Sequence, residues 1–190
     1  MNFKYTFSKQ TTLRINYRGR TTQPSMTDLY SKNDISDPLN IRLTNPNLKP
    51  SFNNNISATF NTYFTETLRS FNANFSYSNT INSTTRIVTY DENTGGRTTQ
   101  PTNVNGNWRI NGSFTFSTPL SNKKFTVNTY TNANYGNSVG FTVLNKESDA
   151  VKSNTTNLFL SERLKGNYRS DLIDCELSAG IIYQKSEHSI

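Results

Sequence analysis

The sequence predicts an all-β protein, an antiparallel up-and-down meander of about eight long strands that forms a transmembrane β-barrel or a segment of a larger barrel wall. Three observations predict this fold class: a hydrophilic composition that is nevertheless rich in aromatics, long runs in which apolar and polar residues alternate, and connections that are short and long in turn. Residues 1–190 are expected to form a single domain.

The composition is typical of a sheet that is exposed to lipid on one face and to water on the other. Only 32% of the residues are hydrophobic and 17% are charged, against about 45–50% apolar residues in ordinary globular domains. Asn, Thr and Ser fill the difference. Disordered chains also lack apolar residues, but they are poor in aromatics, whereas 12% of this chain is Phe, Tyr or Trp. The aromatic side chains are therefore expected to face lipid and the uncharged polar ones to face water.

Alternation is clearest in residues 52–64 and 71–81. In the first run the apolar positions are Phe52, Ile56, Ala58, Phe60 and Phe64, and the positions between them include Asn53, Asn55, Ser57, Thr59 and Asn61. The second run repeats the pattern from Phe71 to Ile81. Both runs exceed the five or six residues that are typical of soluble strands. They match the roughly nine to eleven residues with which a tilted strand crosses a bilayer.

Weaker alternation predicts the remaining strands. In the 155–164 segment the pattern blurs, because Leu158, Phe159 and Leu160 are adjacent. The segments expected to form strands are residues 3–7, 13–17, 108–116, 125–135, 155–164 and 173–183.

Short and long connections alternate along the chain. Short links are expected at residues 8–11, 65–67, 119–122 and 165–171, and long loops at 18–51, 82–106 and 136–154. Membrane barrels have short periplasmic turns at one rim and longer extracellular loops at the other. Five of the six prolines, Pro101 among them, lie in the first two long loops, where no ladder hydrogen bond should be lost.

Several functional classes are disfavoured by the sequence. The net charge of +7 is spread over strand ends and loops, which argues against nucleic-acid binding. One cysteine, Cys175, permits no intrachain disulfide and no thiolate metal site, and is expected to be a small apolar strand residue. No apolar run approaches the roughly 20 residues of a membrane helix.

No catalytic, cofactor-binding or metal-binding residue is expected, and the ligand-binding residues stay unassigned. His188 is the sole histidine and lies near the C-terminus. Asp174 and Glu176, two residues apart, could line a cation site, but a solvated barrel interior explains them better. The 91–96 stretch lacks the ligand spacing of a calcium loop and is predicted to be a turn. The chain is therefore expected not to be an enzyme.

Two further patterns bear on ligands and lipid. The string Gly-Arg-Thr-Thr-Gln-Pro occurs at residues 19–24 and 96–101; it could mark two loops that grip a ligand, although chance or a common way of leaving long strands is the preferred interpretation. Aromatic residues at strand ends could form interfacial girdles at headgroup depth, with a soluble core as the alternative. These residues are Tyr17, Phe64, Tyr77, Trp108, Tyr130, Tyr135 and Tyr183.

The first long loop contains three recognisable elements. They are Gln23-Pro24-Ser25, then Asp37-Pro38-Leu39-Asn40-Ile41, then Asn45-Pro46-Asn47-Leu48-Lys49-Pro50. This series resembles the outer-membrane β-barrel region of TonB-dependent receptors and their relatives from Bacteroidetes. Thr44 and Ser51 depart from the pattern, since a Gly commonly precedes the Asn-Pro pair and an acidic residue commonly follows the last Pro.

The resemblance implies a barrel of about 22 strands with a plug domain inside, and this chain is expected to be an internal piece of its wall. It implies location in the cell outer membrane and, in the complete protein, uptake of a nutrient such as an iron chelate or a glycan. Implied partners are outer-membrane lipid and lipopolysaccharide, the plug domain, the remaining barrel strands and a surface lipoprotein. Two alternatives remain open: a closed eight-stranded barrel, and a secreted or surface-attached β-sandwich that binds glycan or mediates adhesion.

Overall fold

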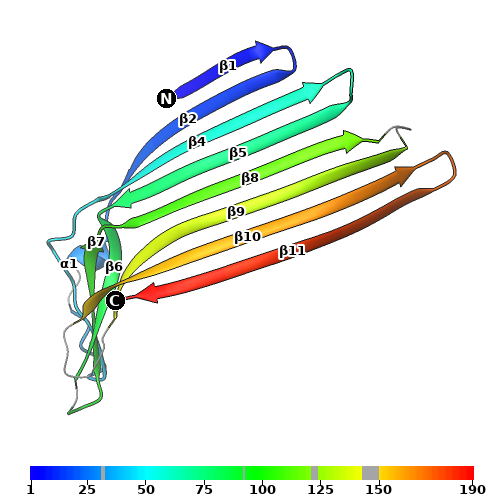
Figure 1. Cartoon of the computed structure of the whole chain (residues 1–190). Helices are drawn as coiled ribbons and strands as arrows, with labels where there is room; N and C mark the ends of the chain where they lie inside the picture. The colour runs from blue at the N-terminus through cyan, green and yellow to red at the C-terminus, as the bar shows by residue number, and fades with distance from the viewer. Residues whose placement is uncertain (31–32, 92, 121–123, 143–149) are drawn as a thin grey trace.

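The computed structural model describes residues 1–30, 33–91, 93–120, 124–142 and 150–190. Its main sheet has eight antiparallel strands in the order β1-β2-β4-β5-β8-β9-β10-β11 (Figure 1). These strands are β1 (Asn2–Ser8), β2 (Thr11–Thr22), β4 (Ser51–Phe64), β5 (Arg69–Ile81), β8 (Asn107–Pro119), β9 (Phe125–Thr142), β10 (Val151–Arg169) and β11 (Asp174–Ser189). The predicted meander of about eight long strands is confirmed.

The first two long connections contain structure that the sequence analysis did not predict. The first contains the short helix α1 (Met26–Tyr30) and the strand β3 (Asn40–Arg42). The second is a hairpin of β6 (Ser83–Tyr90) and β7 (Arg97–Val104), and β3 pairs with β7 in parallel to complete a small sheet. Pro101, expected in an irregular loop, lies in β7 opposite Arg86. Thr, Ile and Val in residues 83–90 favour a strand here.

Several strands extend beyond the expected bounds. β9 and β10 comprise 18 and 19 residues, whereas alternation marked only 125–135 and 155–164. The expected short link at 165–171 is mostly strand, and the turn falls after Arg169. At about 3.3 Å per residue these strands are much longer than a bilayer core requires. In the added part of β9 only Val139 and Phe141 continue the apolar positions, and the added residues of β10 are mostly polar.

The register places the alternating apolar positions of all eight strands on one surface, termed here the outer face. One row of paired residues crosses the whole sheet, and it consists of Tyr5, Leu13, Phe60, Ala73, Phe114, Thr131, Glu162 and Ile181. Aromatic rings meet edge to face along this surface, with ring centroids 5.7 Å apart for Phe60 and Phe71 and 4.8 Å apart for Phe71 and Phe114. Such aromatic contacts between neighbouring strands stabilise the sheet.

The outer face is uncovered. Ile56 is 42% exposed and Phe75 is 47% exposed, in the middle of their strands. Among the described residues the buried hydrophobic side chains are Leu48, Val104 and Val139, and none of them lies in the middle of the wall. A sandwich would bury this face between two sheets. The sandwich alternative is therefore wrong for the described chain.

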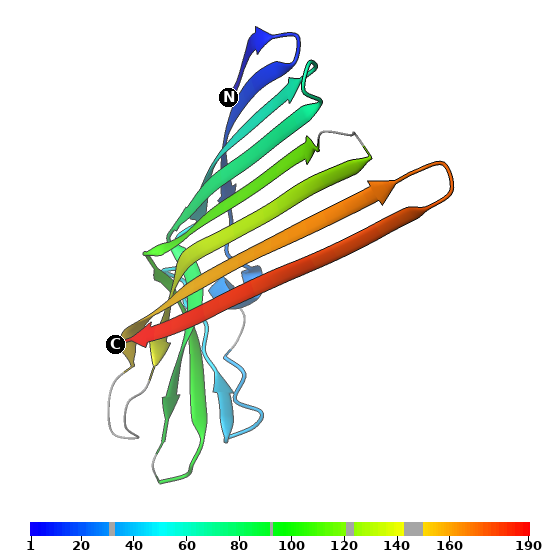
Figure 2. The same ribbon diagram turned by 45° about the vertical axis from the view of Figure 1, so that its right-hand side comes forward.

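The eight-stranded sheet is open and curved (Figure 2). β1 and β11 are its edges and do not pair with each other. β1 pairs only with residues 11–16 of β2. The described strands thus form a partial barrel wall and not a closed eight-stranded barrel. No helix among the described residues is long and apolar enough to cross a bilayer.

Candidate functional site

The second surface of the sheet, termed here the inner face, has the alternate polar positions. Neighbouring strands exchange side-chain hydrogen bonds on it, such as Asn53 Nδ2 to Thr80 Oγ1 at 3.0 Å and Asn111 Nδ2 to Ser76 Oγ at 3.1 Å. No buried side-chain nitrogen or oxygen atom in the described residues lacks a partner. Hydrogen bonds between neighbouring strands and to water therefore offset the desolvation free energy of these amides and hydroxyls.

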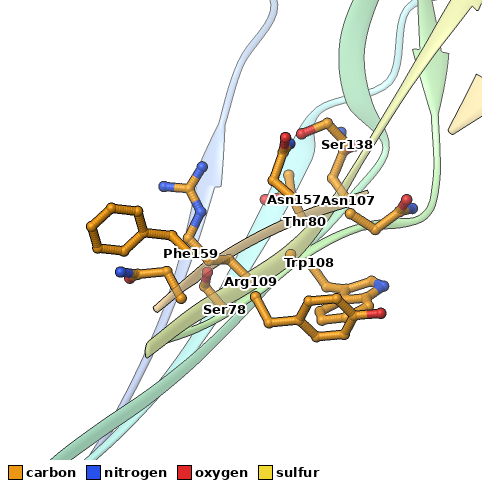
Figure 3. Close-up of a pocket in the computed structure, with 12 residues that line it drawn as sticks. Ser78, Thr80, Asn107, Trp108, Arg109, Ser138, Asn157 and Phe159 are labelled. Atoms are coloured by element: carbon orange, nitrogen blue, oxygen red, sulfur yellow. The ribbon is translucent and has the colours of Figure 1, made fainter. Parts of the chain in front are cut away.

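A hollow with a volume of about 320 Å³ lies on the inner face, toward the long-loop end of the wall (Figure 3). The hollow is lined by Arg109, Asn157 and Phe159. Gly136, which pairs with Arg109, lies at its base and has no side chain to fill it. The rest of its inner-face lining is Ser78, Thr80, Asn107, Asn134 and Ser138. An arginine, several hydroxyls and amides, and one ring suit an oxygen-rich solute.

The rim beyond this hollow is covered by a loop layer, defined as α1, β3, β6, β7 and the segments that join them. Asn103 is its main bridge: its Oδ1 accepts from Lys49 N at 2.7 Å, and its Nδ2 donates to the carbonyl oxygens of Lys49 at 3.0 Å and Asn82 at 2.8 Å. Asn45 Nδ2 donates to Pro101 O at 2.9 Å. The 45–50 element is thereby fixed to β7, and Leu48 is buried beside it.

The 37–41 element is fixed to the other end of β7. Arg97 N donates to Leu39 O at 2.9 Å, and Arg97 Nε donates to Asn40 Oδ1 at 2.8 Å. Residues 40–42 then run parallel to residues 97–99 as β3. Ser25 caps α1 by accepting from Asp28 N at 3.1 Å, and Asp28 O accepts from Asn45 N at 2.7 Å. All three recognised elements therefore build the loop layer.

The loop layer joins the wall at Gly106. Its φ of +118° disfavours any L side chain, and a Cβ there would lie 2.8 Å from Val139 Cγ2. Asn137 Nδ2 donates to Gly106 O at 2.9 Å, and Asn107 Oδ1 accepts from Val139 N at 2.6 Å. This junction is expected to set the position of the loop layer at the rim of the wall.

Gly106→Ala is expected to destabilise this junction by about 1–3 kcal/mol, because it combines an unfavourable φ with a clash against Val139. Urea unfolding in detergent micelles measures the change. Gly95→Ala is the matched control, since Gly95 also has a positive φ, of +70°, but a Cβ there meets nothing within 4 Å. Equal losses in the two variants would show that Val139 does not constrain Gly106.

Three aspartates of the loop layer accept hydrogen bonds that favour their charged form. Hydrogen bonds from the Asn40 side chain and the Leu39 N–H lower the pKa of Asp37. The Ser36 hydroxyl and N–H lower the pKa of Asp34, and the N–H groups of Asn93 and Thr94 are the main causes that lower the pKa of Asp91. Each aspartate thus holds a tight turn in its ionised state.

The order of the 37–41 element should therefore depend on pH. A lowered folded-state pKa stabilises the element above the unfolded value, near 3.9, and this stabilisation is lost as pH falls through the folded pKa. Asp37→Asn is expected to speed hydrogen exchange of the Leu39 amide severalfold at pH 7, with the difference shrinking as pH falls below about 3.9 and through the lowered folded pKa. Asp171→Asn, in the turn at the opposite rim, should leave that amide unchanged. A difference that stayed constant throughout the acid titration of the carboxyl group would contradict the assigned role of the carboxylate.

The residues weighed as sites from the sequence have structural partners. Asp174 pairs with Arg169 at 2.9 Å and Glu176 with Lys165 at 2.7 Å, on the inner face. His188 Nδ1 lies 3.0 Å from Thr155 Oγ1. No group of three potential metal ligands occurs in the described part of the chain. The solvated barrel interior accounts for the two carboxylates.

The repeated string does not form a pair of equivalent loops. Its first copy ends β2, where residues 19–22 pair with β4, whereas most of the second copy forms β7 in the small sheet. Cys175 is exposed on the outer face, opposite Tyr168. Among the girdle candidates, Tyr130 points to the inner face and so cannot join a lipid-facing belt. Phe64 and Trp108 lie at strand ends on the outer face, as a girdle requires.

Two parts of the site were not found from the sequence. Arg109 is the one charged residue in its strand, and its solvent-facing position could have marked the hollow. The bridging role of Asn103 has no local sequence signal, since its partners are 21 and 54 residues away.

Long paired strands with an apolar outer face and a hydrated inner face define this chain as the wall of a transmembrane β-barrel. The model of the "Outer membrane protein beta-barrel family" matches residues 1–186, and the chain belongs to that family. It is accordingly an outer-membrane barrel protein. No curated protein sequence matches the chain.

Proposed function

We propose that this chain forms part of the wall of a TonB-dependent receptor-like transporter that imports a nutrient, an iron chelate or a glycan, across the outer membrane. The observation that supports this most is the inner face, which is predominantly polar across all eight strands of an open sheet. A small closed barrel would fill that face with interlocking side chains. A wide hydrated wall suits a lumen that passes a solute.

The loop layer supports the same function. Two of the three elements that resemble the receptor family, residues 37–41 and 45–50, bind to β7, and the third caps α1, which bonds to Asn45 through Asp28. They place a structured surface at the rim where a ligand would arrive from outside the cell. The plug domain, the remaining strands and a surface lipoprotein are the proposed protein partners, lipid and lipopolysaccharide surround the outer face, and no enzymatic activity is proposed.

Deletion of the gene that encodes the full-length protein tests this function. The deletion strain, the complemented strain and the parent are grown on panels of ferric chelates as sole iron source and of glycans as sole carbon source. Loss of growth on one nutrient, restored by complementation, is expected. Uptake of that nutrient should also stop when a protonophore collapses the inner-membrane gradient, because energy-coupled import requires it.

Two results would overturn the proposal. Uptake that persists in the presence of the protonophore would indicate a passive pore. Unchanged growth of the deletion strain on every ferric chelate and glycan would remove the assigned role in nutrient import.

A further inference from the structure

A cluster of cationic side chains covers the β1–β2 end of the inner face. It comprises Lys4 on β1 and Arg14, Arg18 and Arg20 on β2, and is termed here the basic ladder. The three arginines are separated by even numbers of residues and so project from the same face of the strand. All four side chains are exposed.

None of the four cations of the basic ladder forms an ion pair in the described structure. The three ion pairs of the described residues all involve β11, at the other edge of the sheet. The residues of β4 opposite Arg14, Arg18 and Arg20 are Thr59, Asn55 and Asn53, and they pair onward with Asn74, Ser78 and Thr80 of β5. Uncharged side chains thus occupy the neighbouring two strands of the inner face.

Two of the cations oppose each other directly. Lys4 pairs with Arg14 in the antiparallel ladder, and like charges at such positions destabilise a sheet. The opposite edge of the wall shows the contrast, since Lys165 and Arg169 there each have a carboxylate partner. A set of unneutralised charges on a low-dielectric wall produces a positive potential in the adjoining water.

We infer that the basic ladder attracts and orients anionic solutes, so that the cargo of this barrel carries carboxylate, phosphate or similar oxyanion groups. This inference rests on the proposed transport function, for which it names the cargo class. Guanidinium groups match carboxylate and phosphate oxygens in a two-pronged geometry. The spacing of the arginines along β2 offers successive contacts to a solute that moves along the wall.

Thiol reactivity at two matched positions tests the inference in full-length protein in native outer membranes. A cysteine replaces Asn55, which pairs with Arg18, or Ser113, which lies in the same row as Arg14 but three strands away. That separation is about 14 Å at normal strand spacing. Both variants also contain Cys175→Ser, which removes the native exposed thiol. Anionic and cationic methanethiosulfonate reagents are compared at each position.

At 0.1 M salt the ratio of anionic to cationic reaction rates is expected to be about tenfold higher at position 55 than at position 113, because the screening length is about 10 Å. The triple variant Arg14→Gln/Arg18→Gln/Arg20→Gln should bring the two ratios together. So should 1 M salt, at which the screening length is about 3 Å.

Equal ratios at the two positions in the unaltered ladder would overturn the inference. So would a position-55 thiol that neither reagent reaches while position 113 reacts, since protein would then cover the ladder. Thiol rates require no transport, so failure of the proposed function in the growth experiment is distinguishable from failure here.

Discussion

Replacing Phe114 with arginine is expected to remove most of the assembled protein from the outer membrane. Phe114 lies in the row that crosses the outer face, near the middle of β8. An arginine at the lipid-facing midplane of a barrel costs about 2–4 kcal/mol. The change also removes the edge-to-face contact with Phe71, a type of contact that contributes about 0.5–1.5 kcal/mol. Heat-modifiable migration of membrane fractions and urea unfolding in micelles measure the loss.

Ser113→Arg is the matched control, because residue 113 differs from 114 by one position and faces the inner surface. It should assemble normally and change stability by no more than about 0.5 kcal/mol. Equal damage from both substitutions, or normal assembly of Phe114→Arg, would mean that lipid does not contact the outer face.

Replacing Asn103 with alanine is expected to release the loop layer while the wall stays assembled. The Lys49 N–H and the carbonyl oxygens of Lys49 and Asn82 would each lose a partner. The bond to Asn82 is partly buried and the two to Lys49 are exposed, and a typical hydrogen bond contributes about 0.5–1.5 kcal/mol. Trypsin should then cleave after Arg86 and Arg97 much faster, as mass spectrometry of the fragments can show, while heat-modifiable migration persists.

Asn47→Ala is the control for this effect, because Asn47 is exposed in the same element and its side chain makes none of these bridging bonds. Its cleavage rate should match that of the unaltered protein. Equal trypsin sensitivity of the Asn103 and Asn47 variants would show that the loop layer does not depend on the bridge.

Strand positions could be predicted where the two faces of the sheet differ sharply in polarity. Residues 52–64 and 71–81 have the clearest alternation, and the structure places β4 and β5 there almost residue for residue. The ends of β10 were missed because polar residues occupy both faces there, so no period-two alternation can be detected. The end of β9 was missed because Asn137 interrupts the apolar positions between Tyr135 and Val139.

Two residues that interrupt the alternation of β10 could be assigned to a face of the sheet only from the strand register. Phe159, which blurred the pattern of β10, points to the inner face and lines the hollow with Arg109. Glu162 is the opposite case, a carboxylate in the middle of the outer face whose neighbour Thr131 donates to it from β9. Neither orientation could be assigned from a strand whose pairing partners were unknown.

The candidate site was less predictable than the wall, since its parts come from distant segments. Arg109, Gly136 and Asn157 meet in one row of three strands, and Asn103 reaches Lys49 across 54 residues. The recognised elements at 37–41 and 45–50 indicated a family, but not that they would pair with β7.

The amino-acid sequence was sufficient to determine that this chain forms a membrane-facing β-sheet. Aromatic and amide side chains alternate along its long strands, and successive side chains of a strand point to opposite faces whatever the neighbouring strands are. Tertiary structure alone decided that the sheet stays open, that the loop layer is a paired and hydrogen-bonded structure, and that the cations of β1 and β2 lie together without ion-pair partners among the described residues. Those properties depend on which strands become neighbours and in what register. The sequence of a single segment does not indicate which distant segment its backbone will pair with.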